Sequence, residues 1–414
     1  MTTRRRVTSI AVLICGAFVL GGCTGSDRDS TTLRYAIWDP NQKAAMEQIA
    51  AEFTAENPEV SVEVQLTPYA DYFTKLETTL TSAGGADVFW LNPMNLPLYA
   101  ASGSLTPLRG IDAQAYPDAL VEMFTYQNQL YGAPKDFDTI GLWYNQELFD
   151  TAGIEYPTAD WTWQDMTEAA KATADPKAGI WGIVSIPLGQ THHYNTIAQA
   201  GGEVISADGT TANFDTPEAL AGVEVWTDLI ESGAAPTIAQ VAETDPNAYF
   251  QSGKVAMLPN GSWAAAPYAA DPDLADIVDV VPLPKGPTSA QSVINGLANV
   301  VNAHSEDQDA AIAFAAFASG KRAAEIQAEQ GVAIPAYQGT QDAWLDSVAP
   351  FNGQVFLDAV ATAVPFPVSR NTSGWTSIEY EMLTQIWAGA VPVEAGLRQL
   401  DEQVQAELDE ELPE

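Results

Sequence analysis

Polar and apolar residues follow two different periods along the first part of the chain. Residues 33–38 alternate with a period of two, which is typical of a β-strand, and apolar residues then recur at helical spacing from Met46 to Phe53. Residues 60–66 alternate again, a second helix is expected over 71–82, and the apolar run Val88–Leu91 predicts a fully buried strand. This alternation of strands and helices predicts an α/β fold with a parallel sheet covered by helices.

Residues that cap helices precede several later apolar stretches. Thr162 with Asp165, and Ser305 with Gln308, have the spacing of capping boxes, and Thr216 stands directly before a proline. Near the C-terminal end, apolar side chains recur every three or four residues, which predicts a last helix that docks with one face. The residues of that face are Leu397, Leu400, Val404 and Leu408.

The N-terminal segment has the pattern of a bacterial export signal. Arg4–Arg6 precede the apolar run Val7–Leu20, which as a helix reaches only about 21 Å and is too short for a hydrocarbon core of roughly 30 Å. Small residues then lead into Cys23 as in a lipobox, although an ordinary secretory signal with a coincidental cysteine is the alternative. We expect residues 1–22 to be a cleaved signal peptide and 23–32 to be a lipidated tether.

Length and charge narrow the class of protein. The 414 residues exceed the size at which one core keeps growing, so two or more lobes are expected. The net charge is −37 and the acidic residues are dispersed, which excludes nucleic acid as a partner. Cys15 leaves with the signal peptide, so the mature chain forms no disulfide within itself.

Motifs of the common enzyme classes are missing from the sequence. There is no nucleophile elbow, no phosphate-binding loop, no zinc-protease motif and no paired C-x-x-C. Three histidines are present, and the adjacent His192 and His193 are more typical of a structural or ligand-polar role than of a metal site. We therefore predict a protein that is not an enzyme and needs no cofactor.

Aromatic residues stand beside amides, acids or bases in several predicted turns. Examples are Trp38 with Asp39, Asn260 with Trp263, and the segment 370–375, which runs from an arginine to a tryptophan. A sugar ring has an apolar face and a rim of hydroxyls, so its binding site needs flat aromatic platforms and planar hydrogen-bonding groups. These pairs favour carbohydrate binding.

Several of these segments together carry a family resemblance. Val88–Leu91, Gly132–Thr139 running into Leu142–Asn145, and Phe250–Met257 running into Asn260–Trp263 are similar to the family 1 extracellular solute-binding proteins. The resemblance extends over nearly all of residues 33 to 408. No single one of these motifs is specific, but their order along the chain is.

The resemblance implies a two-lobed, periplasmic-binding-protein-like α/β fold related to maltose-binding protein, with a ligand cleft between the lobes. The first lobe would contain residues 33–137 plus 293–337, and the second residues 138–292 plus 338–414. Cleft closure on a sugar or oligosaccharide would produce the form that the transmembrane subunits of an ABC importer recognise. The implied crossovers lie near Asp138, Ser292 and Tyr337.

The resemblance and the sequence pattern also give a set of ligand-binding candidates. The candidates come from both lobes, as expected for a cleft between them. The protein would act as a monomer on the outer face of the cytoplasmic membrane, and it would touch the membrane only through its lipid anchor. The candidates are Trp38, Asp39, Asn92, Asn95, Lys135, Asp138, Gln190, His192, Tyr194, Asn260, Trp263, Asn295, Arg370 and Trp375.

Two alternatives use some of the same residues. Asp136 and Asp138 would lie about 6.6 Å apart on one face of an extended segment, a separation within the range of an inverting glycoside hydrolase. Lys135 and Arg370 are the basic residues near the predicted cleft, and they would be needed to bind an anion such as a glycerol phosphate.

Overall fold

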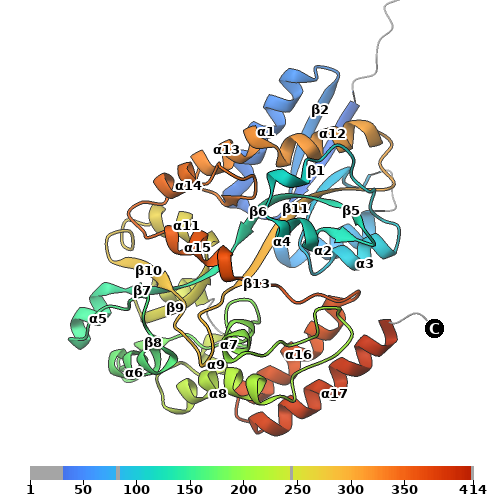
Figure 1. The fold of residues 1–414 in the computed structure, drawn as a ribbon. Helices are drawn as coiled ribbons and strands as arrows, with labels where there is room; N and C mark the ends of the chain where they lie inside the picture. Colours follow the sequence, from blue (N-terminus) through green and yellow to red (C-terminus); the bar gives the residue numbers. More distant parts are fainter. Residues whose placement is uncertain (1–30, 81–83, 243–245, 412–414) are drawn as a thin grey trace, which may run out of the picture.

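Two β-sheets form the framework of the protein (Figure 1). The computed structural model describes residues 31–80, 84–242 and 246–411. The larger sheet has the order β12-β6-β11-β3-β1-β2, with β13 pairing β11. Its strands are β1 (Thr31–Ile37), β2 (Val60–Leu66), β3 (Val88–Leu91), β6 (Gly132–Asp138), β11 (Val293–Val301), β12 (Ile334–Pro335) and β13 (Val364–Pro365).

The larger sheet is mixed, whereas the strand–helix alternation predicted a parallel one. β1 pairs in parallel with β2 and β3, as expected from the helical connections between them. β11 runs antiparallel to both β3 and β6. β6 and β11 are the two long strands through which the chain leaves and re-enters this sheet, so they point in opposite directions.

Helices cover both faces of the larger sheet (Figure 1). One face packs on α1 and α12 around Tyr35 and Trp90, and the other on α2, α3 and α4 around Phe89. The helices are α1 (Lys43–Glu56), α2 (Tyr69–Thr79), α3 (Leu96–Ala101), α4 (Asp118–Met123), α12 (Gln308–Ser319), α13 (Lys321–Glu329) and α14 (Asp342–Ser347), with 3-10 turns η1 (Pro40–Gln42) and η2 (Ala113–Ala115) and a hairpin of β4 (Thr125–Tyr126) and β5 (Gln129–Leu130).

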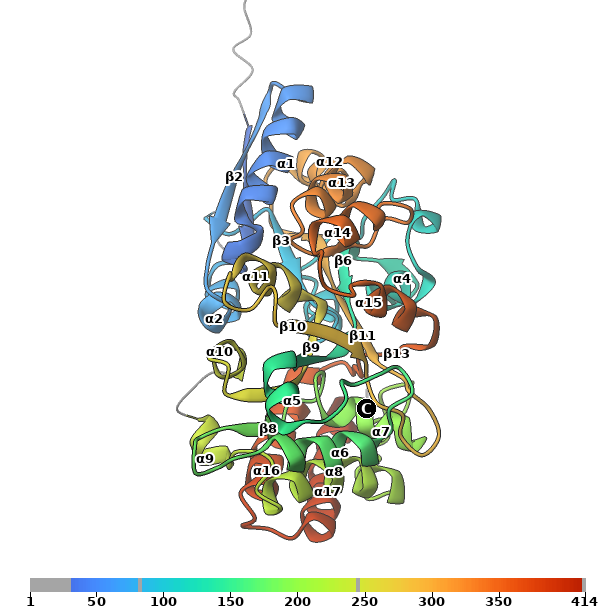
Figure 2. The ribbon, with the colours of Figure 1, turned by 90° about the vertical axis from the view of Figure 1, so that its left-hand side faces the viewer.

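The smaller sheet lies below the larger one in the second view (Figure 2). Its order is β10-β7-β9-β8, with β8 and β9 parallel and the other pairs antiparallel. Its strands are β7 (Ile140–Asn145), β8 (Trp181–Ile183), β9 (Val255–Gly261) and β10 (Val278–Pro282). Its helices and turns are α5 (Gln146–Ala152), α6 (Trp163–Thr173), α7 (His193–Ala200), α8 (Pro217–Glu231), α9 (Ile238–Val241), α10 (Pro246–Gln251), η3 (Ser262–Ala264), α11 (Ala265–Ala270), α15 (Gln354–Ala359), η4 (Val360–Thr362), α16 (Thr372–Trp387) and α17 (Val393–Glu411).

The chain changes sheet over very short segments. Only Thr139 separates β6 from β7, and its hydroxyl donates to the carbonyl of Phe356 at 2.8 Å. The amide of Ile140 donates to the hydroxyl of Ser292 at 2.7 Å, directly before β11 begins. These bonds tie the crossing segments together at a single junction, which we call the hinge.

The residue boundaries of the two lobes stay a prediction, but helix packing favours one change to them. α14 packs against α13, which follows the larger sheet's α12, whereas α15 packs against β10 and β7. The packing therefore favours a third change of lobe between α14 and α15, after the position near Tyr337 that the resemblance implied.

Most of the helix signals in the sequence are confirmed. Thr162 and Asp165 form a capping box, and Thr216 caps α8. The apolar residues of the last helix are all buried. The predicted capping box at Ser305 is wrong: Asp307 is the residue before α12, and the Gln308 side chain donates to the carbonyl of Ser305.

The predicted signal peptide and Cys23 lie outside the described residues. The tether was expected to extend to residue 32, but β1 already begins at Thr31, which pairs with Val60. Within the described ranges, no helix is both long and apolar enough to cross a membrane.

Candidate functional site

Three polar side chains meet at the hinge. Asp138 ends β6 and lies opposite Asn295 on β11, and Gln190 approaches both from the segment before α7. The Gln190 side-chain amide donates to the Asp138 carboxylate, and the Asn295 amide donates to the Gln190 carbonyl oxygen at 3.0 Å. All three are half-buried. The structure therefore brings three predicted residues, Asp138, Gln190 and Asn295, into one row of hydrogen-bonding groups, which we call the hinge row.

The carboxyl group of Asp138 lies in a poorly solvated environment. Burial raises its pKa well above the usual range, and the negative charge of Asp136 raises it further. The hydrogen bond from Gln190 acts in the opposite direction. A ligand hydroxyl that hydrogen-bonds to Asp138 in this environment would meet little competition from water.

Trp38 lies at the end of β1 within a group of aromatic rings. Its ring makes edge-to-face contacts with those of Trp90, Tyr72 and Tyr69, with centroid distances of 5.3, 4.8 and 5.6 Å. Trp38 is half-buried, and Tyr69 is 54% exposed. These edge-to-face contacts fix the Trp38 ring while leaving part of it accessible, as a stacking platform requires.

Asp39 belongs to a hydrogen-bond network that reaches the buried side chains of Gln42 and Lys135. Its carboxylate accepts from the amide of Asn41 at 2.9 Å, which caps η1, and from the Gln42 side chain at 3.2 Å. Gln42 in turn accepts from the Lys135 ammonium group at 2.7 Å. Asp39 is therefore the N-cap of η1, and one line of hydrogen bonds connects it to Lys135.

Lys135 lies in the protein interior, so its burial does not favour the predicted ligand role. It is 1% exposed, forms an ion pair with Asp136, and places its ammonium 4.3 Å from the centre of the Trp90 ring. Burial lowers the pKa of Lys135 and raises that of Asp136. A β-bulge at this position turns the lysine into the interior, so its role is to support Trp90 and Gln42.

Trp263 lies beside the hinge from the side of the smaller sheet. It follows β9, whose Gly261 pairs with Ile140, two residues after Asp138. The ring covers Gly261, where a Cβ atom would come within 2.0 Å of it, and 38% of Trp263 is exposed. The glycine therefore provides the space in which the ring lies, and the ring presents an open apolar surface next to the hinge.

Three predicted asparagines are mainly structural in their contacts. Asn92 accepts from the backbone and side-chain amides of Asn95 at 3.2 and 2.8 Å, which shapes the turn into α3. Asn260 is buried and donates to Asn247 at 2.6 Å. Asn92 and Asn95 lie at the end of β3, but less than a tenth of each is exposed.

Burial also argues against the predicted ligand roles of His192 and Tyr194. His192 is fully buried, with its ring nitrogens 2.7 Å from the Thr191 hydroxyl and 3.2 Å from the carbonyl of Val184. Burial lowers its pKa to about 3, so the ring is neutral. The Tyr194 hydroxyl donates to the buried Glu379 at 2.7 Å. Both residues belong to the packing of the second lobe around α7.

Arg370 and Trp375 are also placed away from the hinge row. Trp375 is fully buried in the core between α16 and α17, and its indole nitrogen donates to the Ser369 hydroxyl at 3.1 Å. Arg370 is exposed and donates to the carbonyl of Glu411 at the end of α17. The expected stacking role of Trp375 and ligand role of Arg370 are therefore not supported by this arrangement.

Two residues of the site were missed in the sequence. Gln42 carries no motif, and its polar side chain gave no sign that it would be buried against Lys135. Tyr69 is the first residue of α2 and carries no motif. Only the contact with Trp38 identifies it.

The arrangement is suited to binding a neutral ligand. It offers little support for the two alternatives, a glycoside hydrolase and an anion-binding protein. Asp136 is committed to Lys135 and to the amide of Leu297, so it does not form an open pair of carboxyl groups with Asp138. Lys135 is buried and Arg370 lies at the end of α17, so neither basic candidate is available for an anion near Asp138. What remains is a row of acceptors and donors beside two partly exposed tryptophans.

Comparison with known proteins also indicates a solute-binding protein. The sequence profile of the bacterial extracellular solute-binding proteins matches residues 38–325. A lactose-binding protein from Rhizobium radiobacter is 27% identical over 287 residues, which are 66% of this chain and 67% of that protein.

Solved structures extend the similarity to the complete fold. An ABC substrate-binding protein from Listeria monocytogenes, in complex with cycloalternan, superposes with a TM-score of 0.86 at 27% identity, over 92% of this chain and 100% of that one. The GacH receptor of Streptomyces glaucescens has a TM-score of 0.81 at 24% identity, over 92% and 100% of the two chains, and shows the fold alone. The chain described here belongs to the bacterial extracellular solute-binding proteins.

Proposed function

We propose that this protein captures a sugar or an oligosaccharide outside the cytoplasmic membrane and delivers it to the permease subunits of an ABC importer. The observation that carries the proposal is the row formed by Asp138, Gln190 and Asn295, which lies beside the exposed ring of Trp263. Planar hydrogen-bonding groups next to an aromatic face match the rim and the apolar face of a sugar ring.

The relatives support a carbohydrate as the ligand. The lactose-binding protein and the cycloalternan complex are both sugar binders by name, each at 27% identity. Because Asp138 and Asn295 lie on strands of the larger sheet and Trp263 follows a strand of the smaller one, a ligand that touches all three would hold the two lobes together. Such a closed form is what a permease would distinguish from the empty protein.

The test is a thermal-shift screen of the chain without residues 1–23 against neutral sugars, oligosaccharides and phosphorylated sugars. We expect a neutral carbohydrate to stabilise the protein, and calorimetry then gives its Kd. Asp138→Asn should weaken binding by about 0.5–1.5 kcal/mol, the net value of a typical hydrogen bond. Asp160→Asn, an exposed aspartate, is the matched control.

Three outcomes would refute the proposal. One is stabilisation by phosphorylated sugars alone, which would indicate an anion-binding protein. Another is turnover of an oligosaccharide that Asp138→Asn abolishes, which would indicate a hydrolase. The third is the absence of any carbohydrate that shifts the thermal transition.

The proposal includes anchoring through Cys23 and action as a monomer. Two acyl chains on one residue give stable membrane attachment, and tethering raises the effective concentration at the permease. In the native host, the full-length protein should partition with the membrane fraction, and Cys23→Ala should release it. Equal partitioning of the two proteins would refute the anchor.

A further inference from the structure

Gln190 differs from its two partners in the hinge row, because it lies in the turn before α7 and they lie on strands. The order of donors in the row is fixed from β11. The backbone amide of Gly296 donates to the side-chain oxygen of Asn295 at 2.9 Å, so the Asn295 amide group is directed to the Gln190 oxygen. Gln190 must then turn its own amide group toward Asp138. A side chain on a turn keeps this orientation only if the backbone of the turn is held.

Asn195 holds that backbone. It lies in the first turn of α7 and is 2% exposed. Its side-chain amide donates to the backbone carbonyl of Gln190 at 2.7 Å, and its side-chain oxygen accepts from the backbone amide of Val293 at 2.8 Å. Val293 begins β11, two residues before Asn295. One buried side chain therefore joins the turn that carries Gln190 to the strand that carries Asn295.

A second residue of α7 strengthens the same connection. Gln199 lies one helical turn after Asn195, on the same side of the helix, and is also buried. Its side-chain amide donates to the carbonyl of Gln291 at 2.9 Å, and its backbone carbonyl accepts from the hydroxyl of Thr288 at 2.7 Å. The helix is thus fixed at two levels to the segment that leads into β11, which restricts movement between Gln190 and Asn295.

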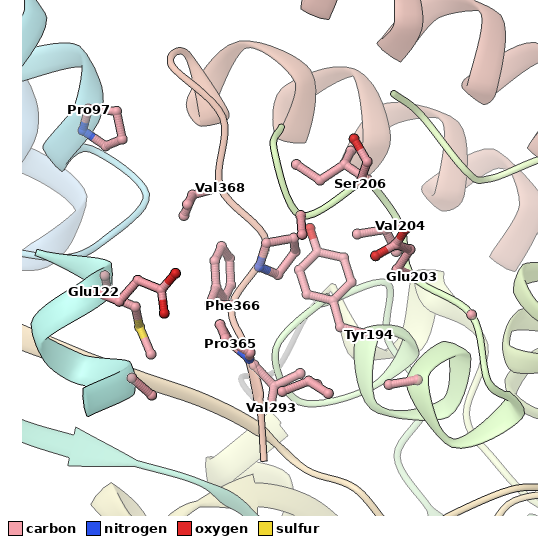
Figure 3. A pocket seen from close by; sticks show the side chains of 18 of the residues that line it. Pro97, Glu122, Tyr194, Glu203, Val204, Ser206, Val293, Pro365, Phe366 and Val368 are labelled. Atoms are coloured by element: carbon pink, nitrogen blue, oxygen red, sulfur yellow. The ribbon is translucent and has the colours of Figure 1, made fainter. Parts of the chain in front are cut away.

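The turn is also held from the side away from the hinge row. A mostly apolar pocket of about 440 Å³ lies there between the lobes, and Val293 and Tyr194 line it, whereas no residue of the hinge row does (Figure 3). Gly189 fits closely against the Tyr194 ring, where a Cβ atom would come within 2.3 Å of it. The Tyr194 hydroxyl is fixed by its bond to Glu379 at 2.7 Å. The backbone of the turn therefore packs on an anchored ring beside Gln190.

We propose that Asn195 is a positioning residue for sugar binding. It fixes the Gln190 carbonyl to the start of β11, and so it keeps the Gln190 side chain between Asp138 and Asn295 before a ligand arrives. This inference rests on the proposed function and assigns how the site is held in shape. A site that is already ordered loses less conformational entropy when it binds. Because Asn195 is buried, it acts through Gln190 and not by contact with the ligand.

The test compares two buried neighbours on α7 in the chain without residues 1–23. Asn195→Leu keeps the approximate shape and removes both hydrogen bonds. Thr196→Val is the matched control, because the Thr196 hydroxyl donates to the carbonyl of Gly222 at 2.6 Å and accepts from Trp226, both on α8. Both variants should lower the free energy of unfolding. Only Asn195→Leu should also weaken sugar binding, by about three- to tenfold.

The probe is the carbohydrate that shifts the thermal transition most in a set that includes lactose, maltose and maltotriose, and calorimetry measures its affinity. A double-mutant cycle then separates positioning from general damage. In a Gln190→Ala background, Asn195→Leu should change the affinity less than twofold, because the side chain that it positions is absent. Hydrogen exchange of the ligand-free protein gives a readout without sugar: the Val293 amide should exchange faster in Asn195→Leu and not in Thr196→Val.

The outcomes distinguish this inference from the proposed function. If no carbohydrate binds the unmodified protein, the proposed function fails. If a carbohydrate binds and Asn195→Leu leaves its affinity unchanged, or weakens it equally in the Gln190→Ala background, Asn195 does not position Gln190. Equal losses of affinity in Asn195→Leu and Thr196→Val, or unchanged exchange at Val293, would overturn the inference as well. Asn195→Ala, which cannot overfill the site, replaces Asn195→Leu in every comparison if that protein does not fold.

Discussion

Trp263 and Trp375 were both predicted to stack on a ligand, and the structure separates them. Trp375 is fully buried among the side chains of α16 and α17, whereas 38% of Trp263 is exposed beside the hinge. Replacing each with alanine should therefore affect different properties. Trp375→Ala should lower the free energy of unfolding, and Trp263→Ala should lower the affinity for sugar.

The expected magnitudes follow from burial. Truncating a buried tryptophan to alanine costs about 3–5 kcal/mol, because it leaves a cavity and removes apolar contact. Trp375→Ala also leaves the Ser369 hydroxyl without its indole donor, which adds about 1 kcal/mol. Trp263→Ala removes a ring that covers Gly261 and is partly solvated, so we expect a loss of stability of about 1 kcal/mol or less.

The assay is urea unfolding followed by circular dichroism, with calorimetry against the sugar found in the screen. Trp263→Ala should keep a cooperative transition and lose affinity by about tenfold or more. Trp375→Ala should unfold at markedly lower urea and, at a temperature where it is folded, bind with an affinity close to that of the unmodified protein.

The opposite pattern would refute this reasoning. If Trp375→Ala retains its unfolding free energy and loses binding, Trp375 stacks on the ligand and must become exposed when the ligand binds. If Trp263→Ala binds normally, the exposed ring beside the hinge has no part in recognition.

Two further predictions concern buried polar residues. Gln42→Met should weaken sugar binding by removing the link between Lys135 and Asp39, and this effect should vanish in an Asp39→Asn background; equal effects in both backgrounds would refute the link. His192 has a folded pKa of about 3 against an ordinary 6.5, so the unfolded chain binds the extra proton and stability falls as the pH drops below 6.5. Between pH 6.5 and 5 this amounts to about 2 kcal/mol, and urea titrations should show that His192→Gln removes that slope while the exposed His304→Gln keeps it.

Individual strands and helices could be predicted from the sequence because residues that are close together in the chain determine them. The period of apolar residues determined β1, α1, β2 and β3, and the Thr162 capping box determined where α6 begins. Trp38 and Asp39 at the end of β1 were also found from local pattern, whereas Asp138 was found from the family resemblance. Their position in the chain is enough to place them at the edge of a sheet.

The burial of single side chains could not be predicted from local pattern. Lys135 and Trp375 stand in segments that match ligand contacts of the family, yet one lies under Trp90 and the other in the core beside α17. The orientation of each depends on a β-bulge or on a helix that lies far away in the sequence. No local signal carries that information.

The sequence by itself determined the class of the protein, its strands and helices, and the turns at which a ligand could bind. The tertiary structure decided which of those side chains reach the hinge row, that Gln42 supports Asp39, and that a separate apolar pocket lies between the lobes. The reason is physical: a local pattern reflects backbone geometry and the burial of one face, whereas a site is formed by side chains from distant segments whose contacts exist only once both lobes have packed.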